Sequence, residues 1–126
     1  VACTSTAVAP RPADPAPAGP DGPPVTTRIE YGDDRSQWVD VTIPATPGPH
    51  PTVAFVHGGF WYDGYGADLM DALVQDASNR GWAAANLEYR RVNGGGGWAG
   101  TFEDVAAGLD LLVDVEGVDT YTRYSV

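Results

Sequence analysis

The sequence contains no lysine and a single cysteine, Cys3, among its 126 residues. One cysteine excludes a disulfide within the chain, and the absence of lysine excludes a phosphate-binding loop of the Walker type. No run of roughly 18 or more apolar residues occurs, so no segment is predicted to cross a membrane as a helix. Seven basic residues against 17 acidic ones give a formal net charge of −10. Such a chain would repel a phosphate backbone, and we expect no nucleic-acid partner.

Proline is confined to one part of the chain, because the 11 prolines lie before position 52. The range 7–24 combines proline with alanine and has almost no large apolar side chain, so it cannot bury enough surface to offset the entropy of ordering. We interpret residues 1–24 as a Pro/Ala-rich leader or linker and residues 25–126 as part of one folded domain. Domains with large α/β sheets often need roughly 200–250 residues, more than this range supplies.

Cys3 lies behind Val1-Ala2 and ahead of the Pro- and Ala-rich run. Its position resembles that of the cysteine in a bacterial lipoprotein signal, which becomes lipidated and N-terminal. Two interpretations remain open. A lipidated Cys3 would anchor a secreted or cell-surface lipoprotein, whereas a stray cysteine in a disordered tail is compatible with a cytoplasmic protein. No other cysteine or histidine lies near it, and we expect neither a metal ion nor a cofactor.

Several short segments have the patterns of β-strands. Apolar and polar residues alternate over 28–31 and 38–43, and the turn-prone Gly32-Asp33-Asp34 separates the two ranges, which predicts a β-hairpin or meander. A continuous apolar run at 52–56, bounded by turn signals, predicts a strand buried on both faces. Another strand is expected at 82–89. The loop that follows contains four consecutive glycines, Gly94–Gly97, and is interpreted as a flexible lid or rim loop.

Two segments have helical periodicity. The first places its apolar residues on one face, and Gly81 is expected to end it in a left-handed conformation. Its face consists of Leu69, Met70, Leu73, Val74 and Ala77. The second is expected to begin with a capping box formed by Thr101 and Asp104. Its stripe consists of Phe102, Val105, Ala106, Leu109, Leu112 and Val113. The alternation of strands and helices predicts an α/β fold with a mostly parallel sheet, an antiparallel start and flanking helices.

The strand at 52–56 runs directly into His57-Gly58-Gly59-Phe60-Trp61. The carboxyl ends of parallel strands are where α/β sheets bind ligands. Because glycine has no Cβ, Gly58 and Gly59 allow a substrate carbonyl to approach backbone N–H groups closely. Such donors stabilise the oxyanion of a tetrahedral intermediate, and the loss of one costs on the order of 3–4 kcal/mol. The segment therefore predicts an oxyanion hole.

The run Val53-Ala54-Phe55-Val56-His57-Gly58-Gly59-Phe60-Trp61 resembles the oxyanion-hole motif of α/β-hydrolases, specifically hormone-sensitive-lipase-like esterases and kynurenine formamidases. Asn86-Leu87-Glu88-Tyr89-Arg90-Arg91 resembles the next strand of that family. The segment from Gly97-Trp98 to Leu109 resembles the loop and helix that follow. The resemblance extends over Trp38 to Val115 and implies the N-terminal part of an α/β-hydrolase fold.

The resemblance also implies roles for individual residues. The backbone amides of Gly58, Gly59 and Phe60 would be the oxyanion donors. His57 would brace the loop through hydrogen bonds and would not be the general base, because the triad histidine of this family comes late in the chain; a strand-end histidine satisfied by the backbone is the simpler alternative. Trp61 and Tyr62 would either line the acyl or leaving-group pocket or pack under the loop.

The nucleophile elbow G-x-S-x-G of this family is absent, since none of the four serines, Ser5, Ser36, Ser78 and Ser125, has glycines two residues to either side. The family order of Ser, then Asp or Glu, then His would place the triad beyond Val126, so the domain at 25–126 is interpreted as truncated before the elbow. The 52–56 strand would then lack its neighbour, and its unpaired apolar edge would favour aggregation or oligomerisation.

Two functions follow from these expectations. The first is a serine hydrolase that acts on small carboxylic esters or aryl formamides through a serine outside this chain. In that case the chain supplies the oxyanion hole and is inactive alone. The second is a non-catalytic remnant or binding module that retains the hydrolase scaffold without its chemistry.

Overall fold

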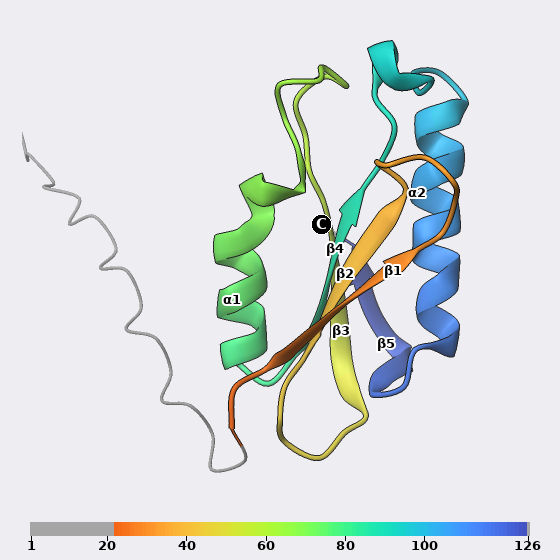
Figure 1. Cartoon of the computed structure of the whole chain (residues 1–126). Coiled ribbons are helices and arrows are strands. Elements are labelled where there is room, and N and C mark those ends of the chain that lie inside the picture. Colours follow the sequence, from red (N-terminus) through yellow and green to blue (C-terminus); the bar gives the residue numbers. More distant parts are fainter. Residues whose placement is uncertain (1–21, 126) are drawn as a thin grey trace, which may run out of the picture.

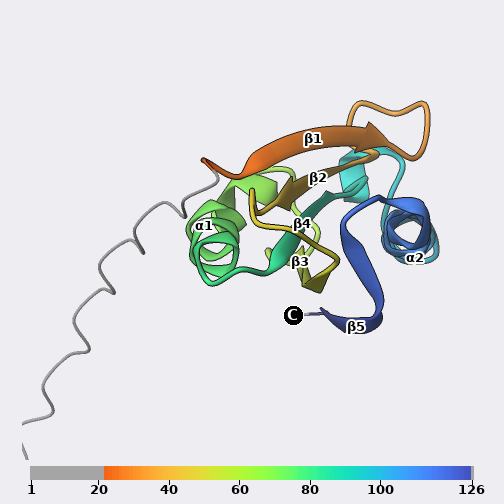
Figure 2. The ribbon, with the colours of Figure 1, turned by 90° about the horizontal axis from the view of Figure 1, so that it is seen from below.

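Five strands form one mixed sheet, which lies between helix α1 (Asp71–Asn79) and helix α2 (Gly100–Asp110) (Figure 1). The computed structural model describes the backbone of residues 22–125 and the side chains of residues 22–119. Cys3 and most of the predicted leader lie outside these ranges. Viewed from below, the two helices cover opposite faces of the sheet (Figure 2). The three layers confirm the predicted α/β class.

Of the five strands, the first four overlap the predicted ranges and the last was not predicted. They are β1 (Val25–Glu30), β2 (Trp38–Ile43), β3 (His50–Val56), β4 (Ala83–Glu88) and β5 (Val118–Ser125). Their order in the sheet is β1-β2-β4-β3-β5. The pairs β1/β2 and β2/β4 are antiparallel, whereas β4/β3 and β3/β5 are parallel. The antiparallel start and the parallel remainder are therefore both as expected.

The expected unpaired edge of the 52–56 strand is wrong. β5 pairs with β3 in parallel, with Thr52 opposite Arg123 and Ala54 opposite Ser125. The polar and aromatic segment after Asp119 forms a strand despite its lack of an apolar run, because ladder hydrogen bonds come from the backbone. In the sheet as described, β1 and β5 are the edge strands, and β3 lies inside the sheet.

The first helical segment is divided into a short 3-10 helix, η1 (Ala67–Met70), and α1. Met70, Val74 and Ala77 pack against the sheet as predicted. Leu69 and Leu73 remain about half exposed. The predicted face is wrong for Leu69, because the change from 3-10 to α-helical winding rotates the residues before Asp71 relative to those after it. Leu73 lies on the predicted side, where it lines an open hollow with Phe55 of β3. Gly81 adopts the predicted left-handed conformation, with φ +84°.

The predicted capping box of the second helix is wrong. α2 begins at Gly100, and the side chain of its N-cap residue, Ala99, makes no capping hydrogen bond. Thr101 and Asp104 are instead buried and bond to the strand-end segment that contains Arg90. Of the predicted stripe, Val105, Leu109 and Leu112 pack in the core, whereas the residues that are exposed are Phe102, Ala106 and Val113. A short 3-10 helix, η3 (Leu111–Asp114), follows α2.

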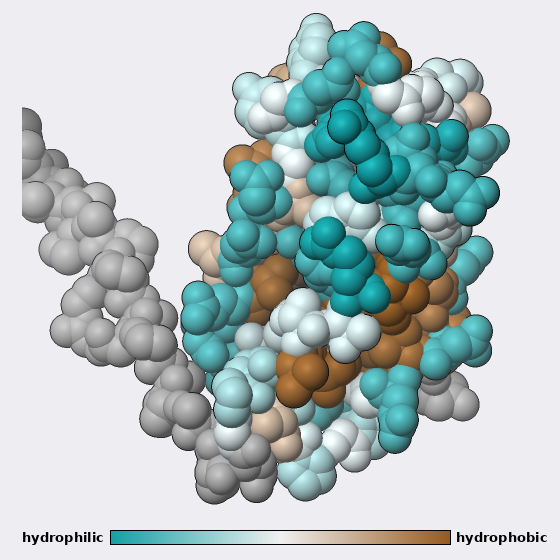
Figure 3. Space-filling model, viewed as in Figure 1, coloured by the Kyte–Doolittle hydropathy of each residue, from teal (hydrophilic) through white to brown (hydrophobic). Residues whose placement is uncertain are grey.

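The core has two parts, one on each face of the sheet. Ala83, Ala85 and Leu87 of β4 pack on the α2 side, and the intervening Ala84 packs on the α1 side, as the alternation of side chains along a strand requires. Figure 3 shows hydrophilic residues over the upper part of one face of the molecule and hydrophobic residues gathered in its lower half. Among the described helices, none is long and apolar enough to cross a membrane.

Candidate functional site

The candidate site is the segment that leaves β3 at its carboxyl end. Within residues 22–119, the N–H groups of Gly58, Gly59 and Phe60 donate no hydrogen bond to the protein. A Cβ on Gly58 would meet no atom within 4 Å, so space is open beside this residue. Free backbone donors next to open space are what an oxyanion-binding segment needs.

The backbone of this segment is held in an unusual turn. The Tyr62 amide donates to the Gly59 carbonyl at 3.1 Å, and the two residues between them, Phe60 and Trp61, have φ values of 54° and 63°. Each non-glycine residue in this left-handed region costs of order 1 kcal/mol or more, and such strain persists only where the surrounding structure imposes it. Here the Val92 amide donates to the Trp61 carbonyl at 3.1 Å and ties the turn to the segment after β4.

Aromatic side chains surround the turn and are largely open to solvent. Phe60 is 90% exposed, and Tyr62 is also exposed. The ring of Trp61 meets Phe102 of α2 edge to face, with centroids 5.6 Å apart, and Trp98 meets the same phenyl ring at 5.4 Å. Trp61 thus packs against Phe102 while the residue stays partly exposed, and its two predicted roles stay predictions.

His57 is buried and is held by side chains as well as by backbone: Glu88 lies on β4, and Tyr89 follows it directly. Its Nε2 donates to Glu88 Oε1 at 2.9 Å, and its ring stacks on Tyr89 with centroids 4.3 Å apart. The Tyr89 hydroxyl donates to the His57 carbonyl at 2.6 Å. The sequence did not identify these partners, and the bracing of the loop by His57 stays a prediction.

Burial raises the pKa of Glu88, but hydrogen bonds from His57, Ala67 and Tyr89 outweigh it, and the pKa lies below its ordinary value. Burial and the nearby Glu88 charge raise the pKa of Tyr89. The carboxylate therefore stays an acceptor and the phenol stays a donor at neutral pH. This is the state that the observed hydrogen bonds require.

A second buried carboxylate, Asp104, holds the far side of the loop region. It accepts two hydrogen bonds from the Arg90 guanidinium, at 2.8 and 2.9 Å, one from the Arg90 amide and one from Gln37 Nε2. The Thr101 hydroxyl donates to the Arg90 carbonyl and accepts from the Gly97 amide. The glycine run is thus connected by hydrogen bonds to α2, and through Thr101 to the segment after β4.

The four glycines of this run are not equivalent, which gives a test. A Cβ on Gly96 would lie 1.8 Å from the Arg90 carbonyl oxygen, whereas a Cβ on Gly94 would meet nothing within 4 Å. Gly96→Ala is expected to lower the free energy of unfolding by about 2 kcal/mol, and Gly94→Ala to change it by less than about 0.5 kcal/mol. Urea unfolding measures both, and equal effects would contradict this packing.

Stability should also depend on acid pH. Hydrogen bonds from Arg90 and Gln37 outweigh the burial of Asp104, so that its pKa, like that of Glu88, lies below its ordinary value. A depressed native pKa stabilises the fold above the unfolded-state value, and this contribution is lost as pH falls through the native value. The free energy of unfolding should therefore begin to fall near pH 5 and continue to fall below the ordinary values of 4.5 and 3.8. Asp104→Asn should flatten this dependence; an unchanged slope would argue against it.

Sequence reasoning missed Asn86, Glu88 and Asp104 as buried polar residues. Asn86 Nδ2 donates to the Ala67 carbonyl at 2.9 Å, while its buried Oδ1 has no hydrogen-bond partner among the described residues. The available signal for Asn86 and Glu88 was their place in a strand otherwise built from alanine and leucine. Polar residues in such a strand are buried only when other groups satisfy them.

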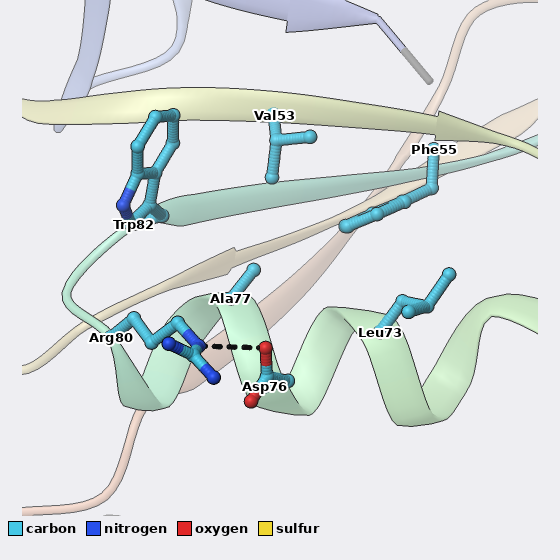
Figure 4. Close-up of a pocket in the computed structure, with 7 residues that line it drawn as sticks. All are labelled: Val53, Phe55, Leu73, Asp76, Ala77, Arg80 and Trp82. Carbon is cyan, nitrogen blue, oxygen red and sulfur yellow. Dashed lines mark hydrogen bonds and ion pairs between the residues drawn. The ribbon is translucent and has the colours of Figure 1, made fainter. Parts of the chain in front are cut away.

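A separate hollow of 410 Å³ lies between β3 and α1, away from the turn (Figure 4). Val53 and Phe55 line it from β3, Leu73 and Ala77 line it from α1, and Trp82 closes one end. The ion pair between Arg80 and Asp76, at 2.8 Å, lies at its rim. None of the predicted site residues lines this hollow.

Two curated esterases are similar to this chain in sequence. No family model matches the chain. A probable isoprenylcysteine α-carbonyl methylesterase of Arabidopsis thaliana is 34% identical over 91 residues, which are 71% of this chain and 19% of the relative. Esterase LipC of Mycobacterium tuberculosis is 34% identical over 67 residues, which are 50% of this chain and 16% of the relative. The chain thus spans less than a fifth of the length of these two relatives.

Solved structures share the fold. Esterase B of Lactobacillus rhamnosis superposes with a TM-score of 0.69 at 23% identity, over 81% of this chain and 34% of that protein. A bacterial heroin esterase gives 0.67 at 24% identity over the same shares. These likenesses agree with the mixed sheet and its flanking helices. The chain therefore has an α/β-hydrolase fold, of which it matches the N-terminal part.

Proposed function

We propose that the chain is part of a serine hydrolase that acts on carboxylic esters or aryl formamides and that it contributes the oxyanion hole. The observation that carries this proposal is that the amides of Gly58, Gly59 and Phe60, at the carboxyl end of a parallel strand, donate no hydrogen bond to any residue that the structure describes. The esterase names of the relatives support the reaction class.

In this mechanism a serine Oγ gives its proton to the general base and attacks the substrate carbonyl carbon, and the carbonyl π electrons move to the oxygen. The amides of Gly59 and Phe60 donate to that oxyanion, each stabilising the transition state by on the order of 3 kcal/mol. Collapse of the intermediate expels the alcohol or amine, which takes up a proton from the general acid. Water then attacks the acyl-enzyme, which releases the carboxylic acid product and regenerates the serine.

The nucleophile would lie on the continuation of β5. Ser125 pairs with Ala54, and β3 reaches its end two residues later at Val56. A strand in the same register would reach the level of the His57 segment about three residues after Ser125. A nucleophile elbow connects a strand to a helix at that edge of the sheet. We therefore assign no catalytic role to Ser125 and place the serine, the acid and the base outside this chain.

Trp61 and Tyr62 would contact the acyl or leaving group of the substrate. Phe102 joins them, because its phenyl ring packs on the ring of Trp61. Exposed aromatic rings beside an oxyanion site suit apolar or aryl substituents, which bury area against them. A small ester or aryl formamide fits such a surface better than a charged substrate does.

The second candidate function is a non-catalytic remnant or binding module on the same scaffold. The observation that favours it is the absence of a G-x-S-x-G sequence among the 126 residues.

Lipidation of Cys3, and with it a secreted or cell-surface location, is a separate proposal. Mass spectrometry of protein produced in a bacterial host would detect the added acyl chains, and an unmodified Cys3 would argue against anchoring.

Activity assays separate the candidates. The purified 126-residue chain is incubated with a p-nitrophenyl short-chain ester and with a fluorophosphonate probe. We expect neither turnover nor labelling, and a labelled serine would contradict the placement of the nucleophile outside the chain. The coding sequence after Val126 provides the second readout: an elbow serine followed by an acid and a late histidine supports the hydrolase, and their absence supports the remnant.

A further inference from the structure

The carboxylate of Glu88 connects both ends of the candidate oxyanion segment. Its Oε1 accepts from His57 Nε2 at 2.9 Å, where the segment begins. Its Oε2 accepts from the Ala67 amide at 3.1 Å, where the segment ends and η1 starts. The Tyr89 amide and Arg91 Nη1 approach Oε1 at 3.0 and 3.2 Å. One buried side chain on β4 therefore spans the loop from residue 57 to residue 67.

Neighbouring contacts leave this loop little freedom at its far end. Asn86 Nδ2 holds the Ala67 carbonyl while Glu88 holds the Ala67 amide. Arg91 donates to the Tyr65 carbonyl as well as contacting Glu88. A Cβ on Gly66 would lie 3.1 Å from Glu88 Oε2, so the backbone passes close to the carboxylate. The loop ends are fixed to β4, and the free amides lie between them.

We propose that Glu88 is the positioning residue of the oxyanion segment: by holding His57 and Ala67 together it fixes the direction of the Gly58, Gly59 and Phe60 amides. The description as an oxyanion segment rests on the proposed function. The positioning itself is independent of substrate, and the experiment below contains none, so its failure and the failure of the hydrolase proposal are distinguishable.

The chemistry requires a carboxylate of this length. Both oxygens face donors, so both must accept. Glutamine offers one acceptor and one donor. Its N–H would face the Ala67 amide if it replaced Oε2 and the Tyr89 amide if it replaced Oε1. In the second orientation the His57 ring can move its proton to Nδ1, beside the Gly58 carbonyl, but the Tyr89 amide still loses its acceptor. A buried donor left without an acceptor is costly, and the same donor facing another donor is repelled. Glu88→Gln is therefore nearly isosteric but reverses one hydrogen bond.

The test is NMR of the isotope-labelled 126-residue chain, with Glu103→Gln as the matched control because Glu103 is an exposed carboxylate on α2. In the wild type and the control, backbone order parameters of Gly58, Gly59 and Phe60 should be near 0.85. In Glu88→Gln they should fall below about 0.6, with core amides of β3 and β4 unchanged. The ring ¹⁵N signals of His57 should show Nε2 protonated in the wild type and a changed proton distribution in the variant.

Two results would overturn the proposal. One is a Glu88→Gln loop as ordered as that of the wild type. The other is a loss of order spread evenly over the chain, which a merely structural role would produce. If the variant does not fold, the wild type is titrated toward acid while the Glu88 carboxyl carbon and the loop amides are followed. Loop order must then be lost as Glu88 becomes protonated; loop order that persists after its protonation rejects the inference.

Discussion

Replacing Gly59 by alanine should lower the free energy of unfolding by about 3 kcal/mol. Gly59 has φ +119°, a conformation that side chains rarely adopt, and a Cβ there would lie 2.5 Å from Tyr65 Cβ and Cγ. Neither group can move freely, because the Gly59 carbonyl accepts from Tyr62 and the Tyr65 carbonyl accepts from Arg91. The variant must therefore displace the turn that presents the free amides. Urea unfolding gives the energy, and NMR shifts of residues 58–62 locate the change.

Gly64→Ala is the matched control for this substitution. Gly64 belongs to the same loop, has no positive φ, and a Cβ there would meet nothing within 4 Å. Its stability should change by less than about 0.5 kcal/mol. Similar losses for the two variants would show that the loop as a whole tolerates alanine poorly and that the contact with Tyr65 is not the cause.

Asp104→Ala should cost about 3 kcal/mol of stability. Asp104 is 2% exposed, and its two oxygens accept two hydrogen bonds from the Arg90 guanidinium, one from the Arg90 amide and one from Gln37 Nε2. Removing the carboxylate leaves these donors without acceptors in a largely buried region. The loss of stability is smaller than for a fully buried pair, because the Arg90 guanidinium can still bind water. Thermal unfolding measures the effect.

The control is Asp110→Ala, which removes an exposed carboxylate from the same helix. A change of under about 0.5 kcal/mol is expected there. Comparable losses at the two positions would mean that Asp104 acts only through helix propensity. A loss confined to Asp104→Ala, together with altered shifts at Gly97 and Arg90, would place the effect in the network that fixes the loop after β4.

Periodicity predicted the first four strands well, because the burial of a strand follows the pattern of apolar and polar residues next to one another in the sequence. β2 alternates and lies next to the edge strand β1, while the continuous apolar run of β3 is buried between two neighbours. β5 was missed because its side chains have no apolar pattern and its place in the sheet depends on backbone pairing. The capping box failed at Thr101 because this hydroxyl finds the Arg90 carbonyl, a partner far along the chain.

The features of the candidate site also fall into those that the local sequence predicts and those that depend on distant partners. The sequence by itself determined the class of fold, the order of its elements and the position of His57-Gly58-Gly59-Phe60-Trp61 after a buried strand, since these follow from local pattern and glycine chemistry. Only the tertiary structure decided that Glu88 reaches His57 and Ala67, and that Phe60 and Trp61 take left-handed conformations. The physical reason is that a buried carboxylate and a strained turn are stable only with partners that folding brings together from distant positions.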